Sequence, residues 1–153
     1  FGQKVTASVS RYGDLVSDLM LEVKLPAIQP PESVLDASGN IRTETAAYWV
    51  NSIGLAVIEN IQIEIGGTDM DTLYPEWIFF WEMTTRPGAR FFKFSPDVEE
   101  DMIEFSSQPR TLYVPLLFWF NKYFMEHGLS IPLIALSYHE IKVLVTFRAL
   151  ADC

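Results

Sequence analysis

Alternation of apolar and polar residues constrains the fold of this chain more than any other feature of its sequence. The alternation is clearest in four segments, residues 4–10, 19–25, 60–65 and 140–148. In the third of these, Ile61, Ile63 and Ile65 alternate with polar side chains. Because successive side chains of a β-strand point to opposite faces, this period of two predicts half-buried strands, each with one face on a core. Such strands are typical of antiparallel sheets.

Four further segments show weaker strand patterns and raise the expected number of strands to about eight. They are residues 46–50, 68–73, 111–118 and 130–136. Gly66 and Gly67 separate two of the expected strands. Glycine adopts the positive φ angles that primed hairpin turns require, so we predict a two-residue hairpin at this position.

One helix is expected to begin at Pro75, because proline fits the first turn of a helix. Trp77, Ile78 and Trp81 then recur at helical spacing, before Arg-Pro-Gly at residues 86–88 ends the pattern. A second, shorter helical turn is expected at residues 121–127.

Two stretches rich in proline, glycine and charge, residues 26–45 and 86–110, are predicted to be long loops. Eight short strands with long loops and one flanking helix predict an all-β fold, an eight-stranded antiparallel jelly roll of the sandwich or barrel type. At 153 residues the chain has the length of one domain with a real core, so residues 1–153 are expected to form a single domain.

Composition excludes several classes of protein. The net charge of -9 offers no basic surface for a nucleic-acid backbone, and 14% aromatic residues are too many for a disordered segment. No apolar run approaches the ~20 residues of a membrane helix, so no membrane insertion is expected. The one cysteine, Cys153, allows neither an internal disulfide nor a zinc cluster.

Residues that could hold a metal ion are few and scattered. His127 and His139 are too far apart in the sequence to form the paired His-x-His of a metal-binding jelly-roll enzyme. Asp69, Asp71 and Glu76 could suggest a site for a hard cation, but the spacing of an EF-hand is absent, and a solvated hairpin is the favoured interpretation. We therefore predict no metal, no cofactor and no catalytic residue.

Two alternatives remain for the loops and aromatic residues. The acidic run at residues 97–101 could bind calcium or a basic partner, although an exposed charged loop is the favoured interpretation. Trp119 and Tyr123, with Asp69 and Asp71, could form a glycan site of lectin type. Without basic neighbours, the aromatic run at residues 118–120 more readily fits a core or subunit contact.

The strand expected at residues 111–118 ends in an apolar run, residues 116–119, so both faces of the strand are apolar there. A two-sheet sandwich with wet outer faces does not need such a strand, so something is expected to cover its second face. The helix around Trp77, a second domain or another subunit could provide this cover.

Three blocks of sequence combine into one recognisable set of motifs. The first block is Phe1-Gly2-Gln3 with Ser10-Arg11-x-Gly13-Asp14-Leu15 and Leu25-Pro26. The central block contains Tyr48, Asn51, Gly54 and Ile58, then Ile63-Glu64-Ile65-Gly66-Gly67 and Glu76-Trp77. The last block contains Tyr113-x-Pro115-Leu116, Phe118-Trp119-Phe120, Gly128-Leu129-x-Ile131-Pro132-Leu133-Ile134-Ala135-Leu136 and Tyr138-His139-Glu140-Ile141. In these residues and in their order, which holds across nearly the whole chain, the sequence resembles the major capsid proteins of nucleocytoplasmic large DNA viruses.

This resemblance implies a non-enzymatic structural protein, in which residues 1–153 form the N-terminal half of a double jelly roll. Because the chain begins at Phe1 without an initiator methionine, it is expected to be part of a longer chain in which a second jelly roll follows. The family implies homotrimers that form pseudo-hexagonal capsomers, contacts with neighbouring capsomers and minor capsid proteins, and an icosahedral virion shell assembled in the host cytoplasm. By the same analogy, residues 86–110 and 26–45 would be outward-facing loops.

The resemblance also selects ten residues as structural family motifs rather than as a chemical site. They are Arg11, Gly13, Asp14, Gly66, Gly67, Trp77, Pro115, Pro132, His139 and Glu140.

Overall fold

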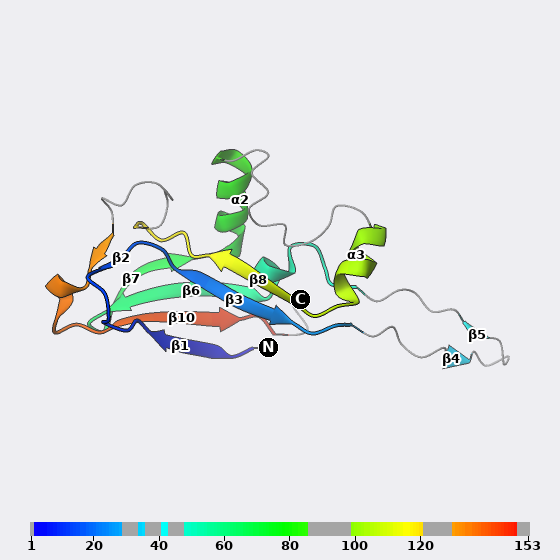
Figure 1. Cartoon of the computed structure of the whole chain (residues 1–153), viewed down its shortest axis with the longest axis horizontal. Coiled ribbons are helices and arrows are strands. Elements are labelled where there is room, and N and C mark those ends of the chain that lie inside the picture. Colours follow the sequence, from blue (N-terminus) through cyan, green and yellow to red (C-terminus); the bar gives the residue numbers. More distant parts are fainter. Residues whose placement is uncertain are drawn as a thin grey trace.

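The computed structural model of the chain describes residues 2–28, 34–35, 41–42, 48–85, 99–120 and 130–149. Within these ranges, strands predominate and helices are short (Figure 1). The strands are β1 (Lys4–Ser8), β2 (Leu15–Val16), β3 (Met20–Leu25), β4 (Val34–Leu35), β5 (Ile41–Arg42), β6 (Ile58–Ile65), β7 (Thr68–Leu73), β8 (Arg110–Pro115), β9 (Ile131–Pro132) and β10 (Ile141–Phe147). The helices are α1 (Ile53–Ala56), α2 (Pro75–Thr85), α3 (Glu99–Ser106) and the 3-10 helix η2 (Ile134–Leu136).

All paired strands of the described chain are antiparallel. One four-stranded sheet has the order β1-β10-β6-β7, and β3 pairs with β8 in a second, two-stranded sheet that crosses over the first (Figure 1). Two short pairs, β2 with β9 and β4 with β5, complete the pattern. The first long strand therefore lies beside the last, as in a jelly roll, and the all-β fold class predicted from the sequence is confirmed.

The core forms where β6 and β10 pair, and the alternation of their sequences explains why. Ile61 lies opposite Val145, and Ile63 lies opposite Val143, so the apolar residues of both strands share one face. All four side chains are buried. Burial of each such side chain contributes about 1.5–3 kcal/mol before entropy is counted, which makes this strand pair the centre of the fold.

The hairpin predicted at the paired glycines is confirmed, because Gly66 and Gly67 connect β6 to β7 and have φ angles of 61° and 84°. Strand β1, by contrast, is not half-buried as its alternation predicts. All five residues of β1 are exposed, because β1 is an edge strand of its sheet and the two-stranded β3-β8 sheet does not extend across it.

Three other strand predictions are wrong in part. Residues 48–50, the described part of the strand expected at 46–50, are not extended in a sheet. The strand expected at residues 111–118 ends at Pro115, and in the segment expected at 130–136 only Ile131 and Pro132 pair with a neighbour. Each of these strands ends at a proline, whose ring fixes φ near about −65°, away from the angles of a regular antiparallel strand.

The prediction of one flanking helix is too simple. Helix α2 begins at Pro75 as expected, but α1 and α3 were not predicted. The second of these lies inside residues 86–110, which were expected to be loop throughout. The helical turn expected at residues 121–127 lies outside the described residues, as does most of the expected loop at 26–45.

The apolar run at residues 116–119 is covered by the chain itself. Leu116, Leu117 and Phe118 are all buried within the common core, and the ring of Phe118 stacks on that of Phe120 with centroids 5.9 Å apart. No second domain or subunit is needed to cover this part of the chain. Exposed apolar side chains lie elsewhere, among them Trp77, Phe79, Phe80 and Met83 of α2.

Candidate functional site

Eight of the ten family-motif residues gather at one end of the molecule, around β2, η2 and the β6-β7 hairpin (Figure 1). We call this group the motif cluster. Its members are Arg11, Gly13, Asp14, Gly66, Gly67, Pro132, His139 and Glu140. They come from three separate blocks of sequence, so the fold brings together residues that are far apart along the chain.

Arg11 connects the start of the chain to the turn before β10. Its guanidinium donates hydrogen bonds to the backbone carbonyl oxygens of Ser137 and His139, the second at 2.8 Å. An arginine suits this task because its planar fork carries several donors in a fixed geometry. Nearby, the backbone N–H of Leu133 donates to the carbonyl of Asp14 at 2.8 Å, which holds β9 against the segment before β2.

Gly66 and His139 fit together closely. A Cβ atom at Gly66 would lie 2.5 Å from Nδ1 of His139, closer than atoms can approach, and the φ angle of Gly66 is 61°. The N–H of Gly66 also donates to the carbonyl of Glu140 at 2.9 Å. Both backbone conformation and space therefore require glycine here, whereas Gly67 has a φ angle of 84° and no atom within 4 Å of its Cβ position.

Glu140 is the centre of a small polar network on the surface of the motif cluster. The hydroxyl of Ser8 donates to Glu140 Oε1 at 2.8 Å, and Lys142 Nζ lies 3.2 Å from Glu140 Oε2. The Ser8 hydrogen bond, followed by the hydrogen bond and charge of Lys142, holds the pKa of the Glu140 carboxyl below its ordinary value. The network ties β1 to β10 through side chains.

Two family-motif residues lie outside the motif cluster. Pro115 ends β8 opposite Met20 and is fully buried, which is a role in packing. Trp77 lies on α2, where its ring centroid is 5.6 Å from that of Trp81. The sequence selected all ten residues as one set, but the structure divides them among the motif cluster, the core and α2.

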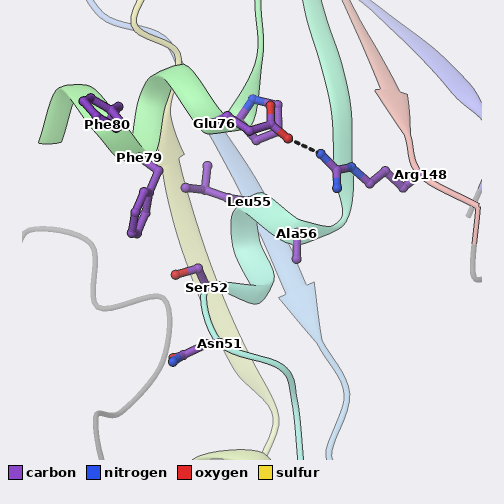
Figure 2. Close-up of a pocket in the computed structure, with 9 residues that line it drawn as sticks. Asn51, Ser52, Leu55, Ala56, Glu76, Phe79, Phe80 and Arg148 are labelled. Carbon is purple, nitrogen blue, oxygen red and sulfur yellow. Dashed lines mark hydrogen bonds and ion pairs between the residues drawn. The ribbon is translucent and has the colours of Figure 1, made fainter. Parts of the chain in front are cut away.

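The second feature of interest is a pocket of about 280 Å³ between α1 and α2. Figure 2 shows Phe79 extending from α2 beside Leu55 of α1, with Asn51 and Ser52 at the opposite wall. Phe80 completes the apolar rim. A pocket of this kind offers aromatic surface with few polar groups, which suits a contact with another apolar side chain better than chemistry.

An ion pair holds α2 against the end of β10 at one side of the pocket (Figure 2). Nη2 of Arg148 lies 2.5 Å from Glu76 Oε1, and Nε of the same side chain donates to the carbonyl of Ile58 at 3.0 Å. Sequence reasoning missed this contact because the two charged residues are 72 positions apart and no local pattern connects them. The exposed Phe79 and Phe80 were likewise not selected.

The described residues of the metal and lectin alternatives are not brought together in a site. Among the described residues, no group of three or more His, Cys, Asp or Glu side chains is placed to hold a metal ion. Trp119 packs on Phe120 with ring centroids 5.2 Å apart, and Asp71 accepts a hydrogen bond from the N–H of Thr72. Tyr123 and His127 lie outside the described residues. The described helices include none long and apolar enough to cross a membrane.

Comparisons with known proteins show which family of proteins this chain is similar to. A family model described as "Major capsid protein N-terminus" matches residues 1–153. "Probable capsid protein 4" of Acanthamoeba polyphaga mimivirus is 35% identical, over an alignment that covers 100% of this chain and 29% of that protein. The "Major capsid protein" of Phaeocystis pouchetii virus is 30% identical, with 100% of this chain and 32% of that protein covered.

The fold has a solved counterpart as well. The structure of PBCV-1 VP54, fitted into a reconstruction of the virophage Sputnik, aligns with a TM-score of 0.71 at 27% identity, covering 96% of this chain and 31% of that chain. The chain thus spans about 30% of the length of the relatives that it matches. The family match over residues 1–153 confirms the resemblance seen in the three sequence blocks: the chain belongs to the major capsid proteins of nucleocytoplasmic large DNA viruses.

Proposed function

We propose that residues 1–153 form the N-terminal jelly roll of a structural major capsid protein, with a second jelly roll after it in the same polypeptide. Three copies associate into a pseudo-hexagonal capsomer, and capsomers tile an icosahedral shell in contact with one another and with minor capsid proteins. The protein is a component of the virion capsid, assembled in the host cytoplasm, and it has no enzymatic role.

The observation that carries the proposal is the match of all 153 residues to the N-terminal model of this family, together with relatives that are named as capsid proteins. The alignment with PBCV-1 VP54 supports it at the level of the fold. The relatives found are named as capsid proteins, and of the two aromatic residues of the lectin alternative Trp119 packs on Phe120 while Tyr123 lies outside the described chain.

The motif cluster supports a structural role in physical terms. Arg11 and Glu140 each tie together segments more than 120 positions apart, at the end of the molecule where the strands are connected. Such contacts fix the connections between strands, as a subunit that repeats by symmetry requires.

Light scattering on the full-length protein tests the proposal. We expect the mass of a trimer at micromolar concentration, and hexagonally packed arrays in electron micrographs at higher concentration. A protein that stays monomeric at every concentration, and never forms arrays, would show that the proposed function is wrong.

A further inference from the structure

The two sheets that pack on each other have unequal numbers of strands. The main sheet has four, in the order β1-β10-β6-β7, whereas the sheet that crosses over it consists of β3 and β8 (Figure 1). Each strand adds about 4.8 Å of width, so a sheet of two strands is about 10 Å narrower than a sheet of four. Within the described residues, the β3-β8 sheet is therefore too narrow to cover the main sheet.

An apolar groove of about 390 Å³ lies between β1 and β3, where this cover is missing. We call it the open groove. Val5 of β1 and Val23 and Leu25 of β3 line it. Val5 lies opposite Val145 of β10, so its side chain belongs to the face of the main sheet that carries the core. Val145 is buried, but Val5 is 49% exposed, which shows that the open groove is core surface without its cover.

Trp49 lines the same groove and contributes a polar group that lacks a partner. Its indole N–H is buried and has no acceptor among the described residues. Buried polar groups of native proteins are nearly always hydrogen-bonded. A further segment of backbone in the open groove would bring carbonyl oxygens, which are the acceptors that an indole N–H needs.

The edge of β3 that faces away from β8 is free to pair with another strand. The N–H of Leu116 donates to the carbonyl of Leu19 at 2.9 Å, and such bonds alternate along an antiparallel pair. The backbone groups of Met20, Glu22 and Lys24 therefore point away from β8, and no strand of the described chain pairs with them. An unpaired strand edge is a template for an added strand.

The strand ends around the open groove indicate which segment fits this edge. Leu25 at the end of β3, Phe147 at the end of β10 and Gln3 directly before β1 all line the groove. A strand that follows β10 would start here and run back antiparallel to β3, whereas a strand leading into β1 would run parallel to β3. All pairs of the described chain are antiparallel, and antiparallel strands need only short connections.

We infer that a strand from the polypeptide after residue 153 pairs with the free edge of β3 and fills the open groove, so that residues beyond 153 complete the N-terminal jelly roll. Apolar residues alternate in this strand, because one of its faces covers the core beside Val23. This inference rests on the proposed function, in which the polypeptide continues after residue 153. The chain covers 29% and 32% of two of its capsid relatives, a difference in length that leaves room for such a strand.

Hydrogen–deuterium exchange of the full-length protein, read at single residues by mass spectrometry, tests the pairing. After correction for intrinsic rates, the amides of Met20, Glu22 and Lys24 should exchange about tenfold or more slowly than the amide of Thr6, because a hydrogen-bonded amide exchanges only when its sheet opens. Exchange at these three positions as fast as at Thr6 would overturn the inference.

Thr6 is the matched control because it lies on the free edge of β1. The N–H of Val9 donates to the carbonyl of Ile141, so by the same alternation the N–H of Thr6 points away from β10. The added strand pairs with β3 and not with β1, so it leaves this amide without an acceptor.

Photo-crosslinking identifies the strand. Full-length protein with benzoylphenylalanine in place of Lys24 should link to a peptide that follows residue 153. In a mixture of isotope-labelled and unlabelled protein, the two linked peptides should come from the same copy. The control carries the same probe in place of Met70, an exposed residue of β7 at the other edge of the main sheet, and should not link to that peptide. A link from position 24 to another segment or another copy, or no link, would overturn the inference.

The outcomes separate this inference from the function on which it rests. Trimers in which the β3 edge exchanges rapidly would overturn the added strand and leave the proposed function intact. A protein that shows the protected edge and the predicted link, but stays monomeric at every concentration, would contradict the proposed function and leave the added strand intact.

Discussion

Replacement of Gly66 by alanine is expected to destabilise the fold more than the same replacement of Gly67, although the two residues share one hairpin. Both have positive φ angles, 61° and 84°. A Cβ at Gly66 would lie 2.5 Å from Nδ1 and 3.1 Å from Cγ of His139, whereas a Cβ at Gly67 would have no neighbour within 4 Å. The pair therefore separates the cost of backbone strain from the cost of a collision.

The magnitudes follow from these two terms. A non-glycine residue in the left-handed region costs about 1–2 kcal/mol, which is the whole effect expected for Gly67→Ala. Gly66→Ala also forces the imidazole of His139 out of its rotamer, which adds about 0.5–1.5 kcal/mol. The free energy of unfolding should therefore fall by about 1.5–3.5 kcal/mol for Gly66→Ala. The melting temperature of Gly66→Ala should lie about 2–4 °C below that of Gly67→Ala for each 1 kcal/mol by which the two variants differ in stability.

Urea and thermal unfolding, followed by tryptophan fluorescence, measure these differences. The decisive variant is Gly66→Ala combined with His139→Ala, because the Cβ of residue 139 remains at an ordinary 3.4 Å after the ring is removed. In the His139→Ala background, Gly66→Ala should cost no more than Gly67→Ala costs in the original protein. Equal costs for the two glycine substitutions, or a cost at Gly66 that does not change when the ring is removed, would refute the reasoning.

Three further predictions concern the polar network, the α2 ion pair and the core. Because the pKa of Glu140 is lowered in the folded protein, its carboxylate stabilises the fold at neutral pH, and this contribution disappears as the pH falls below the ordinary glutamate value of about 4.3. The difference in melting temperature between the original protein and Glu140→Gln should shrink over the same pH range. Arg148→Met removes the side-chain donor to the Ile58 carbonyl and should lower the free energy of unfolding, measured in urea, by about 1–3 kcal/mol. Glu76→Gln changes a largely exposed side chain and should lower it by less than about 1 kcal/mol. Phe118→Ala should lower the free energy of unfolding by about 3–5 kcal/mol, because the ring is fully buried. Tyr113→Ala, at an exposed position, should lower it far less. Equal losses of stability would contradict the burial of residues 116–118 by this chain.

The strands at residues 60–65 and 140–148 were predictable because both neighbours of each are strands of the same chain. Residues 60–65 and 140–148 pair with each other, so the apolar face in the sequence is the buried face in the structure. In residues 4–10 the same alternation is present, but the strand lies at an edge and Val5 stays exposed. Alternation therefore predicts the faces of a strand, but not whether anything covers the apolar one.

The short helices were missed for different physical reasons. Helix α1 spans four residues, fewer than a period of 3.6 needs for a recognisable pattern. Helix α3 begins in an acidic run that is typical of a loop, and its inward positions include Ser106, which is buried and accepts a hydrogen bond from the N–H of Trp49. A buried serine satisfied by a distant backbone group leaves no signal in the sequence.

The family motifs were predictable as a set, but their arrangement was not. Gly66 and His139 stand 73 positions apart, and only the pairing of β6 with β10 brings the hairpin beside the turn before β10. Conversely, the pairing of Arg148 with Glu76 and the exposure of Phe80 follow from the way α2 stands on the sheet. Contacts between distant segments depend on the tertiary arrangement, which local patterns do not contain.

Electron cryo-microscopy of the purified full-length protein tests most directly the claim that this chain is part of a capsid building block. The account predicts a particle with three-fold symmetry and a pseudo-hexagonal outline, in which the fold of residues 1–153 appears once in each of three copies. A reconstruction that shows a monomer, or an assembly without a three-fold axis, would contradict it.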